Sequence, residues 1–168
     1  IDIIADVIPD FMGRMQFVVL GCGDKELSER LRKISDENSE SFVFINDFNE
    51  ELAHKIYASS DIFLMPSRFE PCGLSQMISS RYGSVAVVNS VGGLKDTINY
   101  YPDDLMKSNG FVFDGATASN LKSMLGHIIS VYGSKEVWNN IIRNAMKTDF
   151  SWNRSVLQYI KLFSDLLK

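Results

Sequence analysis

Residues 66–78, PSRFEPCGLSQMI, gather the residue types most suited to binding and transferring a charged group. A carboxylate, Glu70, is followed by a Gly-Leu-Ser tripeptide at the point where a helical pattern begins. The N-terminus of a helix presents free N–H groups and a partial positive charge, and both suit a diphosphate. Gly73 allows a ligand to approach the backbone closely because it has no Cβ, and Ser75 adds a hydroxyl. The segment therefore predicts a phosphate site.

The position of Glu70 limits which phosphate-bearing ligands the segment could bind. A carboxylate so near a phosphate site would repel the phosphate unless a hydroxylated group lay between the two. A sugar meets this condition, because a carboxylate accepts hydrogen bonds from hydroxyls. The pattern thus favours a sugar diphosphate. The alternative is that Glu70 pairs with Arg68 or Arg81 in a purely structural network.

The elements around this segment follow the pattern of an α/β protein. Apolar, β-branched runs alternate with segments of helical period, which is typical of a parallel sheet with crossover helices. Strands are expected at 17–20, 42–45, 62–65, 85–88 and 111–113. Helices are expected at the start of the chain, after Asp24, after Asn49, at 74–82, after Gly92-Gly93, and at 118–132, 135–147 and 152–167. Ligands bind beyond the carboxyl ends of such strands, so the loops at 21–24, 46–49, 66–75 and 89–97 are the candidates.

Length and charge set further bounds. A chain of 168 residues is expected to form one domain with a substantial core. The net charge of -4 gives no reason to expect nucleic acid or a membrane as partner. Cys22 and Cys72 have no metal-ligand spacing. Both fall in candidate site loops, so no disulfide and a reducing compartment are expected. The first residues lack the features of a signal peptide and read as a helix whose start is missing, so we expect a fragment of a longer protein.

Three segments together resemble one enzyme family. SRFEPCGLSQ at 67–76, GGLKDT at 92–97 and DFSW at 149–152 are similar to the bacterial glycogen synthases and plant starch synthases. The resemblance runs over nearly the whole chain. It implies a Rossmann-like parallel sheet flanked by helices, in the C-terminal half of a two-domain (GT-B type) retaining glucosyltransferase. Residues 1–168 would be a single nucleotide-sugar-binding domain, truncated at its N-terminal edge. An upstream strand, a basic pair that clamps the diphosphate, and the N-terminal acceptor domain would all be absent.

The resemblance also assigns roles at the sugar-phosphate end of the site. Glu70 would be the catalytic-region acid that contacts the hydroxyls of the donor glucose. The backbone of the following residues would hold the distal phosphate and the sugar, with one further glycine admitting the phosphate: Cys72, Gly73, Leu74, Ser75 and Gly93. Two plainer interpretations stay open. Cys72 could be a small buried residue, and Gly92-Gly93 could form only a tight turn.

At the nucleoside end, the resemblance implies the turn that contains Gly21 and Gly23, with Phe48 beside the adenine. Phe48 could instead be ordinary packing. Ile78 stands where many related transferases carry a second acid, which favours the synthase subgroup. Outside the site, the residues read as structural: His54 and His127 as structural histidines, Trp138 and Trp152 as core or inter-helix anchors, and the last helix as core packing that a missing domain would partly cover.

The implied reaction is transfer of glucose from ADP-glucose, or UDP-glucose, to the non-reducing end of an α-1,4-glucan with retention of configuration. The glucan would bind through the missing N-terminal domain, and the fragment alone would be inactive. No carboxylate cluster is placed to hold Mg²⁺, so no metal and no cofactor are expected. The compartment would be the bacterial cytoplasm, or a plastid in a plant. The alternatives are a sucrose synthase-like or mannosyl-type retaining transferase, and a nucleotide- or glucan-binding module without chemistry.

Overall fold

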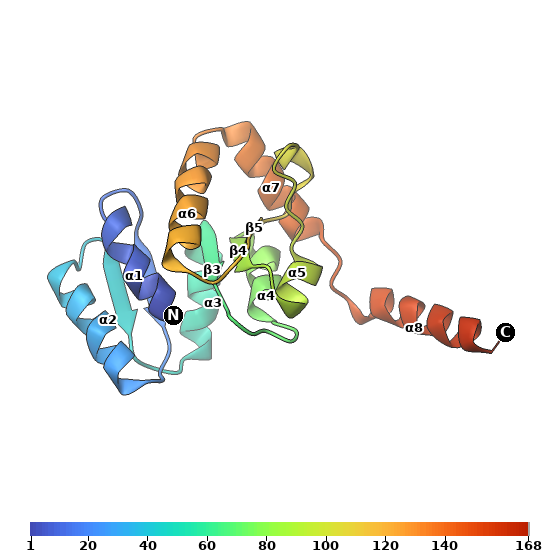
Figure 1. Ribbon diagram of the computed structural model, residues 1–168, viewed down its shortest axis with the longest axis horizontal. Helices are drawn as coiled ribbons and strands as arrows, with labels where there is room; N and C mark the ends of the chain where they lie inside the picture. Colours follow the sequence, from blue (N-terminus) through green and yellow to red (C-terminus); the bar gives the residue numbers. More distant parts are fainter. Residues whose placement is uncertain (168) are drawn as a thin grey trace.

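The computed structural model describes residues 1–167 as a parallel α/β fold, and Figure 1 shows its course. The strands are β1 (Phe17–Leu20), β2 (Phe42–Ile45), β3 (Ile62–Met65), β4 (Val85–Asn89) and β5 (Phe111–Phe113). The helices are α1 (Asp2–Phe11), α2 (Lys25–Glu37), α3 (Glu50–Ser59), α4 (Ser75–Tyr82), α5 (Gly92–Thr97), α6 (Ala118–Tyr132), α7 (Lys135–Lys147) and α8 (Trp152–Leu166), with the short 3₁₀ helix η1 (Leu105–Lys107).

The strands form two separate parallel sheets, whereas the sequence predicts one. β1 pairs with β2, with Phe17 opposite Phe42, and β3, β4 and β5 pair in that order. Within residues 1–167, β1 and β3 are not hydrogen-bonded to each other. A doubly wound sheet of order 3-2-1-4-5-6 has one strand between its second and fourth strands. The observed orders match that arrangement with the intervening strand left out, so the parallel α/β class is confirmed and the continuity of the sheet is not.

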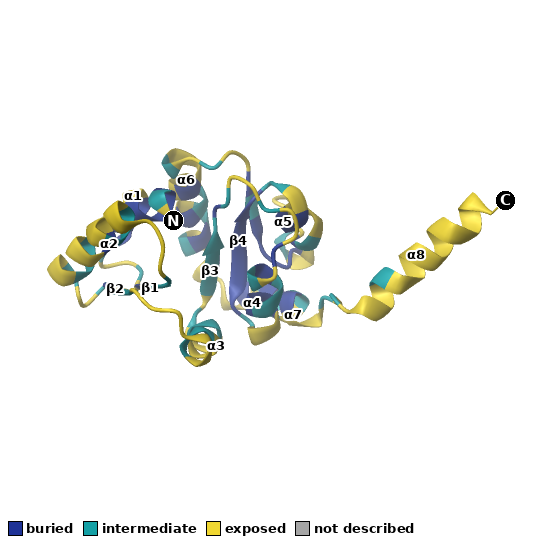
Figure 2. Cartoon of the chain, turned by 90° about the horizontal axis from the view of Figure 1, so that it is seen from below, coloured by how far each residue is buried: buried dark blue, intermediate teal, exposed yellow. Residues whose placement is uncertain are grey.

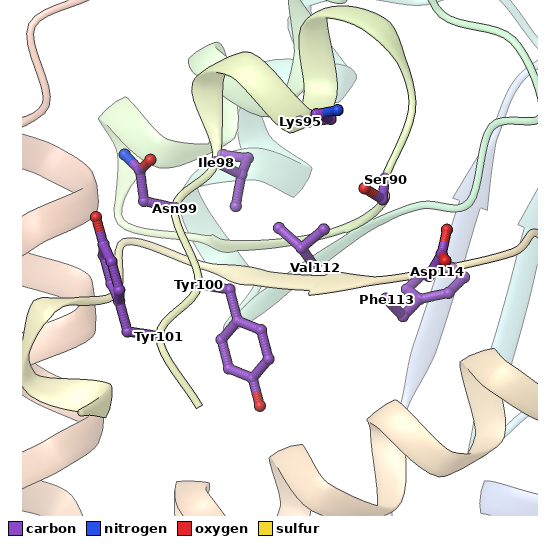
Figure 3. Close-up of a pocket in the computed structure, with 9 residues that line it drawn as sticks. All are labelled: Ser90, Lys95, Ile98, Asn99, Tyr100, Tyr101, Val112, Phe113 and Asp114. Atoms are coloured by element: carbon purple, nitrogen blue, oxygen red, sulfur yellow. The ribbon is translucent and has the colours of Figure 1, made fainter. Parts of the chain in front are cut away.

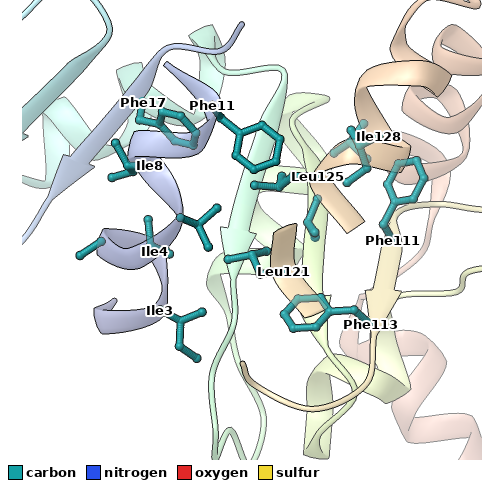
Figure 4. Close-up of a cluster of buried hydrophobic side chains, with 14 of the residues drawn as sticks. Ile3, Ile4, Ile8, Phe11, Phe17, Phe111, Phe113, Leu121, Leu125 and Ile128 are labelled. Carbon is teal, nitrogen blue, oxygen red and sulfur yellow. The ribbon is translucent and has the colours of Figure 1, made fainter. Parts of the chain in front are cut away.

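One hydrophobic core nevertheless spans both sheets. Phe17 and Phe42 of the two-stranded sheet belong to the same buried cluster as Val87 and Phe111 of the three-stranded sheet. Helices α1 and α6 pack against each other and supply much of the remaining apolar surface, as Figure 4 shows. β4 is buried along its whole length, as a central parallel strand with both faces covered must be. This core fixes the carboxyl end of β3 and β4, where the Glu70 segment lies.

Helix α8 is the exception to this packing. It extends away from the body in Figure 1, and Figure 2 shows it almost wholly exposed. None of its residues is buried, so the expected core packing is wrong for the described part of the chain, whereas a bare apolar stripe is expected where a missing domain would cover it. Trp152 is 77% exposed, so the interpretation of it as an anchor is wrong. Trp138, in contrast, is only 5% exposed and stacks on Phe111, which confirms it as a core anchor.

Candidate functional site

The segment at 66–74, hereafter the Glu70 loop, connects the end of β3 to the start of α4. Gly73 has a φ of +75°, a backbone conformation that favours glycine. Leu74 precedes α4 and makes no side-chain cap, so the first turn of the helix lacks a protein acceptor. Within residues 1–167 the amides of Cys72, Gly73, Leu74 and Ser75 donate to no acceptor. These free donors at a helix N-terminus are the arrangement that binds an anion.

The carboxylate of Glu70 is half-exposed and forms no ion pair with either neighbouring arginine. Arg68 instead binds Asp2 of α1 through two hydrogen bonds, of 3.0 and 2.6 Å. Arg81 donates to the carbonyl oxygen of Met146 at 2.9 Å. The alternative of a structural network between Glu70 and these arginines is therefore wrong. The Arg68 guanidinium also holds the pKa of the Asp2 carboxyl well below its usual value, mainly through this hydrogen bonding.

Cys72 and Leu74 both face solvent. Leu74 is 65% exposed. Cys72 is an exposed free cysteine, so the interpretation of it as a small buried residue is wrong. Cys22 is also free and exposed, as expected without a disulfide. Gly73, between Cys72 and Leu74, is buried.

Gly92 and Gly93 pack directly against the Glu70 loop. A Cβ at Gly92 would lie 2.0 Å from the carbonyl oxygen of Glu70, and one at Gly93 would lie 2.0 Å from that of Cys72. The amide of Gly93 also donates to the Glu70 carbonyl at 3.1 Å. More than a tight turn is thus formed here. The space left by the missing side chains is filled by the protein's own backbone, and a role for Gly93 in admitting phosphate stays a prediction.

Sequence reasoning missed two residues that join these segments. The side chain of Gln76 is fully buried, and its amide nitrogen Nε2 donates to the carbonyls of Cys72 (3.2 Å) and Gly73 (2.9 Å). The same nitrogen lies 3.1 Å from Oγ1 of Thr97, at the end of α5. Thr97 in turn donates to the carbonyl of Gly93 at 2.6 Å. No local pattern predicts the contact between Gln76 and Thr97, because these residues are 21 positions apart.

The predicted nucleoside residues lie at the carboxyl end of the other sheet. Gly21 follows β1, and its amide donates to the carbonyl of Ile45 at 3.1 Å. Gly23 is exposed just before α2. Phe48 is 86% exposed, so it is not ordinary packing. In the described part of the chain, no hydrogen bond or ion pair joins these residues to the Glu70 loop. Both groups nevertheless lie at the carboxyl ends of parallel strands, as expected.

A hollow in the described part of the chain contains none of the predicted site residues. It has a volume of about 680 Å³ and borders β5 and the segment after α5, as Figure 3 shows. Its lining is Ser90, Lys95, Ile98, Asn99, Tyr100, Tyr101, Val112, Phe113 and Asp114. Burial, and secondarily the charge of Asp103, raises the pKa of the Tyr100 hydroxyl. Across residues 1–167, no group of three or more His, Cys, Asp or Glu side chains could hold a metal ion.

The two histidines differ in their surroundings. His54 is exposed on α3, with Nδ1 3.0 Å from the hydroxyl of Tyr82. His127 lies on α6 against the rings of Tyr100 and Phe111, and its Nε2 has no hydrogen-bond partner within the described chain. The contacts of both histidines lie outside the Glu70 loop, in agreement with their interpretation as structural residues. Among residues 1–167, no helix is long and apolar enough to span a membrane.

A parallel α/β fold with free amides at a helix N-terminus beside a carboxylate is an arrangement suited to a nucleotide sugar. The family model of the glycosyl transferases group 1 matches residues 1–130. The chain therefore belongs to the group 1 glycosyl transferases.

Individual relatives show which members of this family the chain is similar to. The chain is 40% identical over 167 residues to a glycogen synthase of Elusimicrobium minutum, covering 99% of this chain and 35% of that protein. It is 46% identical over 154 residues to a glycogen synthase of Kosmotoga olearia, covering 91% of this chain and 32% of that one. The chain thus spans about a third of the length of these curated relatives.

Solved structures agree in fold. The catalytic domain of starch synthase IV from Arabidopsis thaliana, bound to ADP and acarbose, is 34% identical with a TM-score of 0.78. The match covers 89% of this chain and 32% of that one. Sucrose-phosphate synthase from Thermosynechococcus elongatus matches with a TM-score of 0.67 at 18% identity, over 99% of this chain and 42% of that one, which supports the fold alone.

Proposed function

We propose that this chain is the donor-binding part of a glycogen or starch synthase. The whole enzyme transfers glucose from ADP-glucose to the non-reducing end of an α-1,4-glucan and retains the anomeric configuration. The observation that carries the proposal is the row of free amides at 72–75 beside the unpaired carboxylate of Glu70. The 40–46% identity to glycogen synthases and the likeness to a starch synthase bound to ADP and acarbose support the choice of donor and acceptor.

The amides at the start of α4 would hold the distal phosphate of the donor. In front-side displacement the acceptor hydroxyl oxygen bonds to the anomeric carbon on the face from which the phosphate oxygen leaves with the electron pair of the broken bond. The hydroxyl proton passes to the departing diphosphate, on which negative charge develops. Fixed N–H donors and the positive end of a helix stabilise that charge without reorganising. Glu70 would accept hydrogen bonds from the glucose hydroxyls and so orient the ring. The nucleoside would bind at the carboxyl end of the two-stranded sheet, to Gly21, Gly23 and Phe48.

Residues 1–168 are proposed to be the C-terminal nucleotide-sugar-binding domain without its first strand. The strand orders β2-β1 and β3-β4-β5 support this, because they match the order 3-2-1-4-5-6 with the strand between β1 and β3 left out. An N-terminal domain would supply the acceptor surface, and its closure would exclude water and suppress hydrolysis of the donor. The isolated chain is therefore proposed to be inactive, and the enzyme to work in the bacterial cytoplasm, as a plastid enzyme only if the source is a plant.

The test is transfer of labelled glucose to a short α-1,4-glucan by the full-length polypeptide. ADP-glucose and UDP-glucose are compared at equal concentrations, and we expect the higher kcat/KM with ADP-glucose. Glu70→Ala should lower kcat by roughly 100-fold or more, because a contact near the reacting carbon is lost. Glu136→Ala, which removes an exposed carboxylate from α7, is the matched control and should be neutral.

Two results would count against the proposal. Wild-type protein that transfers no glucose from either nucleotide sugar would reject the reaction. Glu70→Ala protein as active as Glu136→Ala protein would reject the role of Glu70 while leaving the reaction in place.

A further inference from the structure

The Glu70 loop is held from two sides by hydrogen bonds that form a closed path. On one side, the amide of Gly93 donates to the carbonyl of Glu70 at 3.1 Å. On the other, the two N–H groups of Gln76 Nε2 are shared among three acceptors: the carbonyls of Cys72 and Gly73, at 3.2 and 2.9 Å, and Oγ1 of Thr97. Thr97 closes the path between α4 and α5: its hydroxyl accepts from Gln76 Nε2 at 3.1 Å and donates to the carbonyl of Gly93 at 2.6 Å.

The centre of this path is buried, at the bond from Gln76 to Gly73, and its other side-chain bonds are part-buried. Gln76 is 0% exposed and Gly93 is buried. Buried polar groups lose much more when left unpaired than they contribute when paired. The carbonyls of Cys72 and Gly73 point inward to Gln76, and the peptide groups therefore direct their amides the other way. The orientation of the amides of Gly73 and Leu74 is thus a consequence of where Gln76 holds the carbonyls of Cys72 and Gly73.

We propose that Gln76 and Thr97 are positioning residues for the donor site. They fix the two peptide groups between Cys72 and Leu74, so that the amides of Gly73 and Leu74 point away from Gln76 in a constant geometry, and they tie the Glu70 loop to α5. Neither residue touches the donor. The inference rests on the proposed function for its effect on transfer, whereas the positioning itself concerns only the loop.

The fold contains a matched control for Thr97. Thr148, after α7, donates to the carbonyl four residues earlier, that of Asn144, at 2.8 Å. It also accepts from a buried side-chain amide, that of Asn109, at 3.1 Å. The two threonines therefore make the same pair of hydrogen bonds, and only Thr97 is bonded to the residue that holds the Glu70 loop. Asn109 also lies 3.3 Å from the carbonyl of Thr97, so the control additionally tests whether a disturbance spreads along this route.

The experiment compares Thr97→Val, Thr97→Ser and Thr148→Val in the full-length protein. Valine matches threonine in shape and lacks the hydroxyl, whereas serine keeps it. Thr97→Val should raise the KM for ADP-glucose and lower kcat, by roughly three- to tenfold together, which corresponds to one hydrogen bond. The KM for the glucan should not change. Thr97→Ser should recover most of the loss. Thr148→Val should lower the melting temperature about as much as Thr97→Val does, without altering the KM for ADP-glucose.

A larger change at Gln76 tests the other end of the path. Gln76→Met fills a similar volume but leaves the carbonyls of Cys72 and Gly73 without a donor. We expect a loss of roughly 10- to 100-fold in kcat/KM for the donor, since a misplaced binding group is costly. Should this variant fail to fold, Thr97→Val against Thr97→Ser carries the test alone.

A measurement independent of activity separates this inference from the proposed reaction. The amide of Gly93 is buried and bonded to Glu70, so its hydrogen exchange reports the contact between α5 and the loop. Exchange in the peptide 91–98 should be faster in Thr97→Val than in Thr97→Ser or Thr148→Val. Equal exchange in all three proteins would overturn the positioning role, whatever the wild-type protein transfers. A donor KM that rises equally in Thr97→Val and Thr148→Val would also overturn it, because the effect would then be general destabilisation.

Discussion

Replacing Gly93 by alanine would separate the Glu70 loop from α5. The new Cβ would lie 2.0 Å from the carbonyl oxygen of Cys72 and 2.6 Å from its Cα. Both contacts are with backbone, which cannot rotate away as a flexible side chain can. Contacts between a Cβ and another heavy atom below 3.0 Å are essentially unknown, so the loop or the helix must move by about 1 Å.

The expected cost has three parts. Overpacking against backbone destabilises by roughly 1–3 kcal/mol. Loss of the hydrogen bond from Gly93 to Glu70 adds about 0.5–1.5 kcal/mol. Alanine regains about 1 kcal/mol as a better helix former than glycine. The net effect is a loss of about 0.5–3.5 kcal/mol in the free energy of unfolding. A shift of about 1 Å in a group that binds the donor should also lower kcat/KM by roughly 100-fold.

Gly126→Ala is the control, because it makes the same chemical change without a clash. Gly126 lies in the middle of α6, and a Cβ there meets no atom within 4 Å. It should stabilise the protein by roughly 0.5–1 kcal/mol and leave transfer unchanged. Urea denaturation and glucose transfer from ADP-glucose are measured on both full-length variants. If Gly93→Ala matches Gly126→Ala in stability and in kcat/KM, the contact between α5 and the Glu70 loop does not hold the site.

Two further predictions concern the edges of the site. Phe48→Ala should leave the free energy of unfolding within about 0.5 kcal/mol of wild type, because Phe48 is 86% exposed. It should weaken ADP binding by about 1–3 kcal/mol if the ring stacks on the base, and unchanged binding in a calorimeter would remove Phe48 from the nucleoside site. Asp2→Asn should cost less than about 1 kcal/mol at pH 6 in low salt, since the ion pair with Arg68 is about half exposed. The folded-state pKa of Asp2 is lowered, so the pair contributes above the ordinary value of 3.8 and its contribution is lost as the pH falls further. Urea denaturation between pH 6 and pH 3 should show the variant and wild type converging, and a constant difference would contradict this linkage.

The strands and several helix starts could be predicted from sequence because they depend on local features. The expected bounds of β1, β2, β3 and β5 match those observed, and β4 extends one residue further, to Asn89. Asp24 and Asn49 accept hydrogen bonds from the amides three residues later, at 2.8 and 2.9 Å, as capping residues do. Ser134 occupies the same position before α7 and makes no such bond, so a hydroxyl alone does not guarantee a cap.

Features that depend on distant partners were out of reach. The division of the sheet follows from which strands lie side by side, and the pattern of a strand does not state its neighbour. Gln76 reads in sequence as one more polar residue of a short helix, yet it is fully buried because three acceptors from two other segments converge on its amide. Trp152 illustrates the opposite error, because an apolar stripe indicates burial without naming what covers it.

The contact of Gly92 and Gly93 with the Glu70 loop has a consequence for engineering donor preference. Residues in direct contact respond to substitution non-additively. A Glu70 loop transplanted from a transferase of different specificity would meet the carbonyl positions fixed by the α5 glycines of its host. Loop exchange should therefore succeed only when residues 66–76 and 92–97 are exchanged together, because the two segments form one structural unit although they are separate in sequence.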